Sequence, residues 1–189
     1  MTHALNSSSL PSDESLIERV ANGDLQALGA LFDRHEAPVR RFLGRLGVAA
    51  HDADDLVQAT FLEVVRAAPR FDVALSAKCW LFGIAVILVR RHRRSLSRAA
   101  AQLLRWARTP HEDSPITPAA QVERDQELLR FQRALDALPA KKREVFTLVT
   151  LEGLHGEEAA RTLGIPVATV RTRLHHARLE LRAALAEEP

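Results

Sequence analysis

Cysteine is almost absent from this sequence, because Cys79 is the only one among 189 residues. A lone cysteine excludes an intramolecular disulfide bond, as is usual for proteins of a reducing cytosol. Glycine and proline are also sparse, at 8 and 9 residues, which excludes a collagen-like or low-complexity chain. With 47% hydrophobic residues, the sequence instead predicts a globular cytoplasmic protein with a substantial core.

Long hydrophobic runs are missing as well. The most apolar run, Cys79 to Val89, is followed at once by Arg90 and Arg91. It is far shorter than the roughly 20 residues of a membrane-spanning helix. Residues 1–15 are polar and lack the basic start and apolar centre of a signal peptide. We therefore expect no membrane insertion and no signal peptide.

Apolar residues recur at intervals of three and four along most of the chain, which is typical of helices with one buried face. Helices are expected over residues 16–47 (interrupted at 22–24), 52–67, 76–94, 121–137, 140–151, 157–163 and 167–186. Prolines and small polar residues over 108–118 indicate a linker, and the preceding residues 95–107, rich in alanine and arginine, are expected to be either helical or frayed. The sequence thus predicts an all-α protein with a disordered tail at 1–12, two small helical domains at 13–95 and 121–187, and a flexible linker at 96–120.

The last two predicted helices form a helix-turn-helix motif. Gly164 is suited to end the first of them, and Pro166 is tolerated in the first turn of the second, where its missing amide is not needed. Ala160 is small enough to let the two helices cross closely. The inward stripe of the second helix is expected to be Val170, Leu174, Ala177, Leu181 and Leu185.

The opposite face of this second helix is polar and basic, and no acidic residue occurs between Glu158 and Glu180. In such motifs the second helix enters the major groove, where Arg pairs with guanine and Thr contacts base edges or thymine methyl groups. The candidate DNA-binding residues are Thr169, Arg171, Thr172, Arg173, His176 and Arg178. A solvated face of a helical bundle is the alternative, and the tight turn together with the acid-free face favours DNA.

A second basic region runs from Val73 to His111 without one acidic residue. Such clustering is typical of surfaces that bind a polyanion, with a solubilising surface as the alternative. Its cations are Lys78, Arg90, Arg91, Arg93, Arg94, Arg98, Arg105 and Arg108. Phe71, Trp80 and Phe82 lie nearby and are suited to stacking on unpaired bases, with core packing expected for at least one of the last two.

An acidic segment precedes this region. Asp52, Asp54 and Asp55 crowd the first turn of the helix predicted over 52–67, where the helix dipole favours carboxylates. Gln58 follows one turn later on a shared face. Carboxylates do not help to bind DNA, so this face either complements the dipole alone or forms a docking surface for a basic protein partner.

These segments, in this order, resemble the extracytoplasmic-function (ECF) sigma factors of bacterial RNA polymerase. The resemblance rests on "DADDLVQATFLEVV", on "RFD…WLFGIA…RRHRR" and on "ALDALPAKKREVF…GIPVATVRTRLHHAR", and it covers roughly residues 16–94 and 123–185. It implies a first domain that binds the β′ clamp helices of core RNA polymerase and reads the minus-ten promoter element. It implies a second domain that binds the β flap and reads the minus-thirty-five element.

The resemblance also implies roles for single residues. The core-polymerase site would comprise Asp52, Asp55, Leu56, Gln58 and Phe61. Of these, Asp55 and Gln58 would make the contacts, whereas Leu56 and Phe61 would pack inside. The minus-ten site would comprise Phe71, Lys78, Trp80, Arg90, Arg91 and Arg94, with the loop 69–77 capturing an unpaired base. The minus-thirty-five site would be the polar face of the second helix of the motif.

Two segments depart from the family pattern. The basic and polar residues usual after "WL" are replaced by Ala85-Val86-Ile87, so minus-ten recognition is either altered or carried by Arg90–Arg94. His155-Gly156 stands where the family commonly has a hydroxyl residue and an aromatic one. That change would loosen the first turn of the motif or alter a phosphate contact.

Two other classes of function fit parts of the sequence. A stand-alone helix-turn-helix regulator would share the reading helix but would not need the second basic region or the acidic segment. An enzyme would have to use His155, His175, His176 or Cys79, which show no zinc-ligand spacing and no nucleophile elbow. We therefore expect a non-enzymatic protein without metal or cofactor. Its partners, as the resemblance implies, are core RNA polymerase, promoter DNA and an anti-sigma factor.

Overall fold

The computed structural model describes residues 11–106 and 124–187, here called the N-terminal and the C-terminal block, and both consist of helices joined by short turns and loops. The N-terminal block contains α1 (Asp13–Ala21), α2 (Leu25–Arg45), α3 (Ala50–Ala67), the 3-10 turn η1 (Ala68–Arg70) and α4 (Ala77–Trp106). The C-terminal block contains α5 (Arg124–Ala137), α6 (Ala140–Phe146), the π-helical turn η2 (Thr147–Leu151), α7 (Gly156–Leu163) and α8 (Val167–Glu187). The prediction of an all-α fold is confirmed for these residues.

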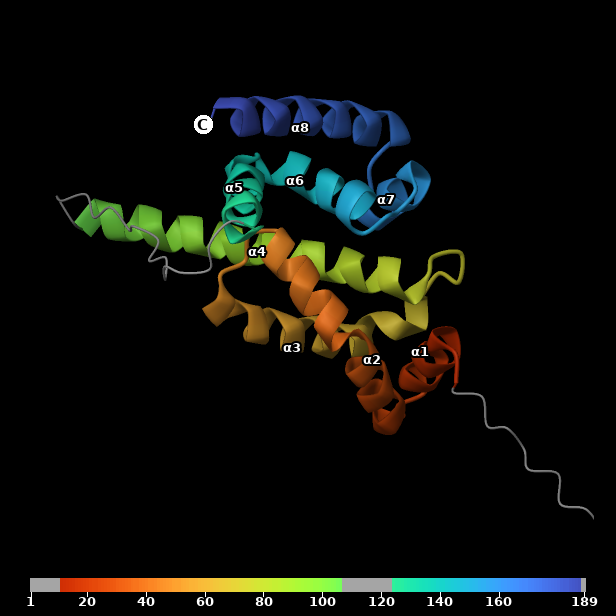
Figure 1. Ribbon diagram of the computed structural model, residues 1–189. Coiled ribbons are helices and arrows are strands. Elements are labelled where there is room, and N and C mark those ends of the chain that lie inside the picture. The colour runs from red at the N-terminus through yellow and green to blue at the C-terminus, as the bar shows by residue number, and fades with distance from the viewer. Residues whose placement is uncertain (1–10, 107–123, 188–189) are drawn as a thin grey trace, which may run out of the picture.

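The predicted tail and linker fall largely outside the described residues, on 1–10 and 107–120. Figure 1 shows the C-terminal block stacked on the N-terminal block, with α4 lying between α3 on one side and α6 and α7 on the other. The two helical units expected from the sequence therefore lie against each other and share a long boundary.

A turn at Gly23 separates α1 from α2, as the sequence predicts. Gly23 adopts a φ of 88°, and Asp24 then caps α2 by accepting hydrogen bonds from the amides of Gln26 at 2.9 Å and Ala27 at 3.1 Å. Arg19 pairs with the same carboxylate at 2.7 Å. The hydrogen bond from this guanidinium is the main reason that the pKa of Asp24 lies below its ordinary value, and the bond from the Ala27 amide adds to it.

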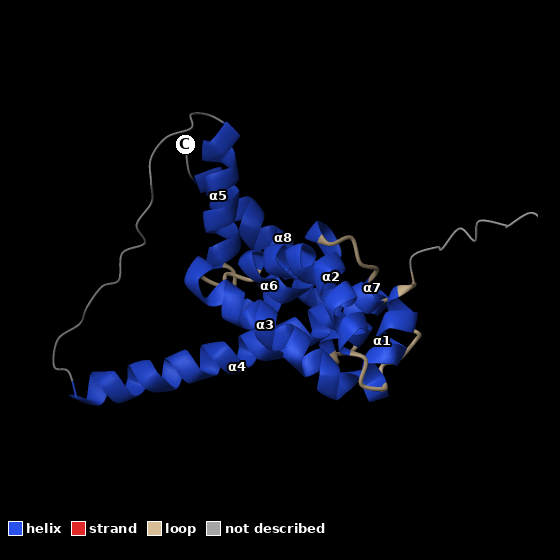
Figure 2. Ribbon diagram, turned by 90° about the horizontal axis from the view of Figure 1, so that it is seen from below, coloured by secondary structure: helices blue, strands red, loops and turns tan. Residues whose placement is uncertain are grey.

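The helix α4 is longer than the sequence analysis predicts. Ser76 caps it as expected, because its hydroxyl oxygen accepts a hydrogen bond from the Cys79 amide at 3.3 Å. The helix does not end at Arg94 but continues to Trp106, so residues 96–106 of the predicted linker are helical. No glycine or proline follows Gly83 in this stretch, and its alanines, leucines and arginines are strong helix formers. Over 30 residues the helix is about 45 Å long, and its second half projects from the body (Figure 2).

No helix within the described ranges is both long enough and apolar enough to cross a bilayer. A smaller correction concerns the predicted helix 140–151, which changes from α6 to the π-helical turn η2 after Phe146. Neither glycine nor proline occurs in that stretch, so the sequence carries no local signal of the change.

One hydrophobic core runs through both blocks. In the N-terminal block it is centred on Phe42 and Phe82, whose rings stack with their centroids 4.1 Å apart. The same buried cluster continues into the C-terminal block through Val145, Leu148 and Leu163. A second, smaller cluster lies within the C-terminal block and contains Ala134, Leu135, Leu138, Phe146, Ala177 and Leu181. The boundary between the blocks is therefore apolar over much of its area.

Two glycines of the N-terminal block allow the C-terminal block to approach closely. A Cβ atom on Gly83 of α4 would lie 3.2 Å from the carbonyl oxygen of Thr162 in α7. Gly47, which follows α2 with a φ of 79°, is still tighter, because a Cβ atom there would overlap the guanidinium of Arg143 in α6. That guanidinium is buried and donates to the carbonyl oxygen of Leu46 at 3.1 Å. Burial is the main cause that lowers the pKa of Arg143.

Replacing Gly47 therefore tests the junction between the blocks, and Gly23 supplies a matched control. Both glycines have positive φ, but nothing lies within 4 Å of a Cβ atom on Gly23. We expect Gly23→Ala to lower the free energy of unfolding by about 1 kcal/mol, which is the cost of the left-handed backbone. Gly47→Ala should cost about 2–4 kcal/mol, because it also displaces a buried, hydrogen-bonded guanidinium. Urea unfolding followed by circular dichroism measures both, and equal losses would contradict the proposed clash.

Candidate nucleic-acid interface

The helix α8 is held by its apolar stripe and by the turn before it. Gly164 ends α7 in the left-handed conformation, with a φ of 64°, and the small side chain of Ala160 is buried, as predicted. Val170, Ala177 and Leu181 are buried, Leu174 is half-buried, and Leu185 is 37% exposed. The inward stripe is thus confirmed for its first four members, whereas Leu185 lies close to the end of the helix and stays partly in solvent.

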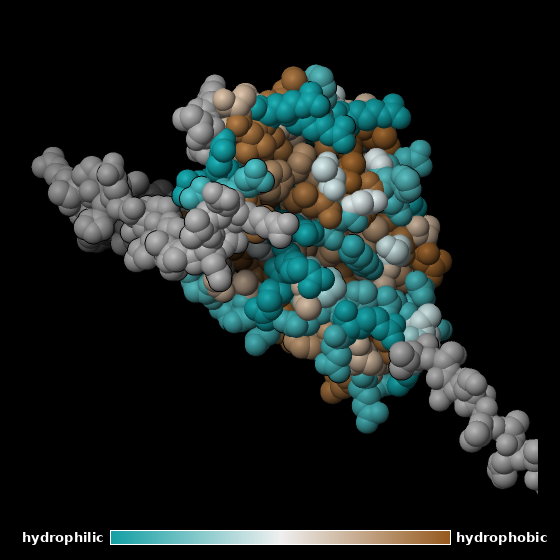
Figure 3. Space-filling view, viewed as in Figure 1, coloured by the Kyte–Doolittle hydropathy of each residue, from teal (hydrophilic) through white to brown (hydrophobic). Residues whose placement is uncertain are grey.

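The polar face of α8 points into solvent. Arg171, Thr172, His176 and Arg178 are exposed, and Thr169 and Arg173 are half-buried. The Thr172 hydroxyl donates to the carbonyl oxygen of Ala168 at 3.0 Å. In Figure 3 this helix forms the upper edge of the molecule, where hydrophilic side chains gather. The predicted reading residues therefore lie together on one accessible helix.

The first turn of α7 is held in place despite the unusual His155-Gly156. His155 precedes the helix in extended conformation, and its backbone amide donates to the Glu158 carboxylate at 2.8 Å. This bond is one half of a capping box. The Glu158 carboxylate satisfies the amide of the residue before the helix, so this contact of the first turn does not require a hydroxyl at position 155.

The second predicted site brings Phe71 and Trp80 together. Their rings meet edge to face with centroids 5.0 Å apart, and both residues are half-buried. Phe82 is completely buried, so the expectation that at least one of Trp80 and Phe82 packs in the core is confirmed. The loop before α4 is ordered by Asp72, whose carboxylate accepts from the Ala74 amide at 2.9 Å. An aromatic pair thus lies beside a structured loop, at the place where base capture is expected.

The six predicted minus-ten residues differ in solvent exposure and in ion pairing. Arg91 and Arg94 are exposed and, with Ser97 and Arg98, line an open groove along α4. Lys78 and Arg90 are half-buried instead, and each is paired with a carboxylate of the C-terminal block. The replaced segment of the family pattern, Ala85-Val86-Ile87, contributes two buried residues and one exposed residue.

The ion pairs of Lys78 and Arg90 involve two glutamates that the sequence analysis did not single out. Glu144 of α6 accepts two hydrogen bonds from Arg90, at 3.0 and 2.7 Å, and is 1% exposed. The hydrogen bond to this carboxylate raises the pKa of Arg90. Glu152 accepts from Lys78 at 3.0 Å and also pairs with Arg45. Neither glutamate lies in a sequence pattern that indicates burial, so only the packed structure identifies the two.

The carboxylates of the acidic segment differ in their exposure and in their contacts. Asp52 is half-buried and lies 3.2 Å from His92 of α4. Asp54 pairs with Arg40 of α2, and that hydrogen bond raises the pKa of Arg40. Asp55 is exposed on the same helix.

The remaining members of the predicted core-polymerase site follow the helical period. Gln58 is exposed one turn after Asp55. Leu56 and Phe61 are buried in the core, as expected of them. They hold α3 in position, and the accessible part of this predicted site is formed by Asp55 and Gln58.

The residues considered for an enzymatic site are dispersed. Cys79 is buried, and His175 and His176 lie next to each other on α8 with ring centroids 5.8 Å apart. Within the two described ranges, no group of three or more histidines, cysteines and carboxylates has the proximity that a metal ion requires.

Comparison with known proteins identifies both blocks. The family model described as "Sigma-70 region 2" matches residues 31–99, and the one described as "Sigma-70, region 4" matches residues 128–181. Among curated proteins, the RNA polymerase sigma factor CnrH of Cupriavidus metallidurans is 33% identical over 181 residues, which cover 92% of this chain and 94% of that protein. The ECF RNA polymerase sigma factor SigE of Mycolicibacterium smegmatis is 36% identical over 185 residues, covering 94% of this chain and 70% of that protein.

Solved structures agree with the sequence comparisons. The structure of CnrH in complex with the cytosolic domain of CnrY matches with a TM-score of 0.67 and 29% identity, covering 95% of this chain and all of that chain. The sigma factor RpoE in complex with the anti-sigma factor NepR, from Bartonella quintana, matches with a TM-score of 0.64 and 26% identity over 84% of this chain and 96% of that chain. The chain belongs to the ECF sigma factors, the family that binds core RNA polymerase and directs it to promoters for transcription initiation.

Proposed function

We propose that this sigma factor divides promoter recognition between α8 and the start of α4. The exposed, acid-free face of α8 reads the minus-thirty-five element through Thr169, Arg171, Thr172, Arg173, His176 and Arg178. The aromatic pair of Phe71 and Trp80 captures an unpaired minus-ten base, while Lys78, Arg90, Arg91 and Arg94 bind the phosphates beside it. The observation that carries this proposal is the accessible reading face of α8 behind a well-formed turn.

Core RNA polymerase docks on the start of α3 in this proposal. Asp55 and Gln58 are the accessible polar side chains there, and a carboxylate on an exposed helix face suits a basic protein surface. The proposed domains are 13–95 and 121–187, with the connecting residues 96–120 as a tether. Each reader then needs only modest affinity, because polymerase and the tether keep the second site at a high effective concentration.

An anti-sigma factor is a further proposed partner. The support is the likeness to two sigma factors that were solved in complexes with CnrY and NepR. The chain is proposed to have no catalytic activity of its own and to act in the compartment that holds RNA polymerase and DNA.

Run-off transcription tests the proposed activity directly. Purified protein is added to bacterial core polymerase and genomic promoter fragments, with core alone as the control. We expect discrete transcripts that require the protein, and their start sites would locate both promoter elements. Specific binding to duplex DNA by the protein alone, with no transcripts and no binding to core, would instead identify a stand-alone regulator.

Arg171→Ala tests the reading helix. Loss of a guanidinium that pairs with a base should weaken promoter-specific transcription by about tenfold, corresponding to 1–3 kcal/mol per bidentate contact. Binding to core polymerase should not change. Arg133→Ala on α5 removes the same charge from an exposed position away from the reading face and serves as the control. Normal promoter use by Arg171→Ala would remove this residue from the interface.

Asp55→Asn tests the docking surface on α3. We expect affinity for core polymerase to fall several-fold, with the effect shrinking at high salt, because an exposed charge at an interface is screened. Fluorescence anisotropy of labelled protein titrated with core measures this. The control is Asp33→Asn on α2, which changes another exposed carboxylate in the same way. Equal affinities for the two variants would exclude a specific contact by Asp55.

A further inference from the structure

Two cations of the proposed minus-ten site are already bound to carboxylates of the C-terminal block. The Arg90 guanidinium makes a bidentate pair with Glu144, using Nε at 3.0 Å and Nη2 at 2.7 Å. Such paired hydrogen bonds between charged groups are among the strongest polar contacts in proteins. The carboxylate of Glu144 has almost no exposed surface, so Arg90 is covered on the side that it presents to α6.

The carboxylate of Glu152 makes a second contact of the same kind. Glu152 lies just after η2, and its side chain is 8% exposed. One carboxylate oxygen lies 3.0 Å from Lys78 Nζ, and the other pairs with Arg45. Lys78 is at the start of α4, two residues before Trp80. The two glutamates therefore bind cations at two places along α4, twelve residues apart, and tie both to the C-terminal block.

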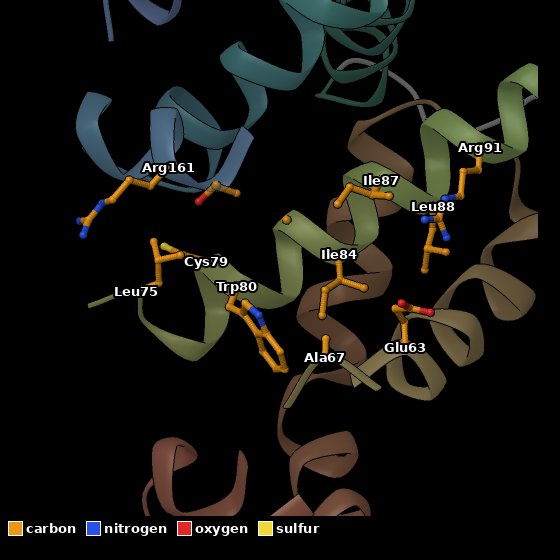
Figure 4. Close-up of a pocket in the computed structure, with 12 residues that line it drawn as sticks. Glu63, Ala67, Leu75, Cys79, Trp80, Ile84, Ile87, Leu88, Arg91 and Arg161 are labelled. Atoms are coloured by element: carbon orange, nitrogen blue, oxygen red, sulfur yellow. The ribbon is translucent and has the colours of Figure 1, made fainter. Parts of the chain in front are cut away.

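The loop before α4 is covered from the same direction. Arg161 of α7 donates to the carbonyl oxygen of Ala74 at 3.1 Å. Figure 4 shows Arg161 extending from α7 near Leu75 and Cys79, and Arg161 lines the same pocket as Trp80. The proposed base-capturing loop is thus held by a residue of the helix-turn-helix motif.

We propose that Glu144 and Glu152 form an ionic clasp that closes the C-terminal block onto the minus-ten site and keeps the free sigma factor from binding DNA at that site. The proposal rests on the proposed function of Lys78 and Arg90. Phosphate groups of the promoter strand and the two glutamates compete for the same cations, so the strand binds only when the blocks separate. Arg161 completes the closure by holding the loop at Ala74.

Physical chemistry favours the clasp as a switch with two states. A buried carboxylate is tolerated only while it is paired, and loss of its partner leaves an uncompensated charge. Once the blocks separate, water solvates Glu144 and Glu152, and both cations become available to phosphates. Opening therefore exposes the DNA-binding cations and the carboxylates together, and intermediate positions of the blocks would leave charges buried and unpaired.

The first test measures closure in the absence of DNA. Donor and acceptor dyes are placed on Ser15→Cys in α1 and Ala183→Cys in α8, both exposed positions, in a Cys79→Ala background. We expect high energy transfer in the otherwise unchanged protein and a rise of about tenfold or more in the open fraction for Glu144→Gln/Glu152→Gln. The control Glu127→Gln/Glu157→Gln changes the net charge equally at exposed positions of the C-terminal block and should remain closed.

The second test measures DNA binding with a mixed-sequence single strand of about 20 nucleotides. Release of Lys78 and Arg90 allows two more phosphates to be neutralised, so the plot of log affinity against log salt should become steeper by about 1.4 units for Glu144→Gln/Glu152→Gln. The control pair should keep the slope of the parent protein. An unchanged slope in a variant that does open would overturn the claim that closure masks these cations.

A steric variant opens the blocks without changing any charge. Gly83→Leu places a side chain against the Thr162 carbonyl, whereas Gly29→Leu on α2 meets nothing within 4 Å of its Cβ atom. Gly83→Leu should reproduce both the open state and the steeper slope, and Gly29→Leu should reproduce neither. If the glutamate variant stays closed while Gly83→Leu opens, the carboxylates do not form the clasp. If the protein gives no transcripts with core polymerase but energy transfer finds it closed, the proposed function is refuted and the closed state still stands.

Discussion

A carboxylate in a protein interior needs a cation, and this requirement governs how the two blocks meet. Glu144 is 1% exposed, and the bidentate guanidinium of Arg90 comes from the other block. Two parallel hydrogen bonds fix orientation as well as distance. The pair of Arg90 and Glu144 therefore sets how α6 packs against α4. The close approach of α7 to Gly83 is part of the same packing. The core that continues from Phe82 to Leu148 fills the space between these contacts.

The near-neutral net charge of +2 conceals a strong separation of charge. The exposed polar face of α8 is basic, the exposed start of α3 carries Asp55, and the boundary between the blocks pairs Arg90 and Lys78 with glutamates. A protein that binds a polyanion and a protein partner at once needs such separation, since mixed surfaces would repel one of them. Composition alone reports the sum of these charges and therefore says little about either interface.

The sequence predicted most of the helices, the turns and the exposed polar face of α8, because each depends on residues close together in the chain. Gly23 with Asp24, Ser76 as a cap and Gly164 before α8 all act within one turn of helix. The sequence could not predict the contact of Glu144 with Arg90, which lie 54 residues apart. It left open whether residues 95–107 are helical or frayed, and only the structure shows that α4 runs to Trp106.

A closed resting form makes promoter choice more selective than two independent readers would. Any DNA can attract the exposed cations of α8, but DNA that engages only this helix gains nothing that offsets separation of the blocks. In the proposed function, a promoter bound together with core polymerase engages α8, the aromatic pair of Phe71 and Trp80, and the surface at Asp55, and these contacts jointly offset the cost of opening. Because every DNA sequence that binds at the minus-ten site carries that cost, weak binding at this site alone is suppressed most, and the combined interaction is the dominant one.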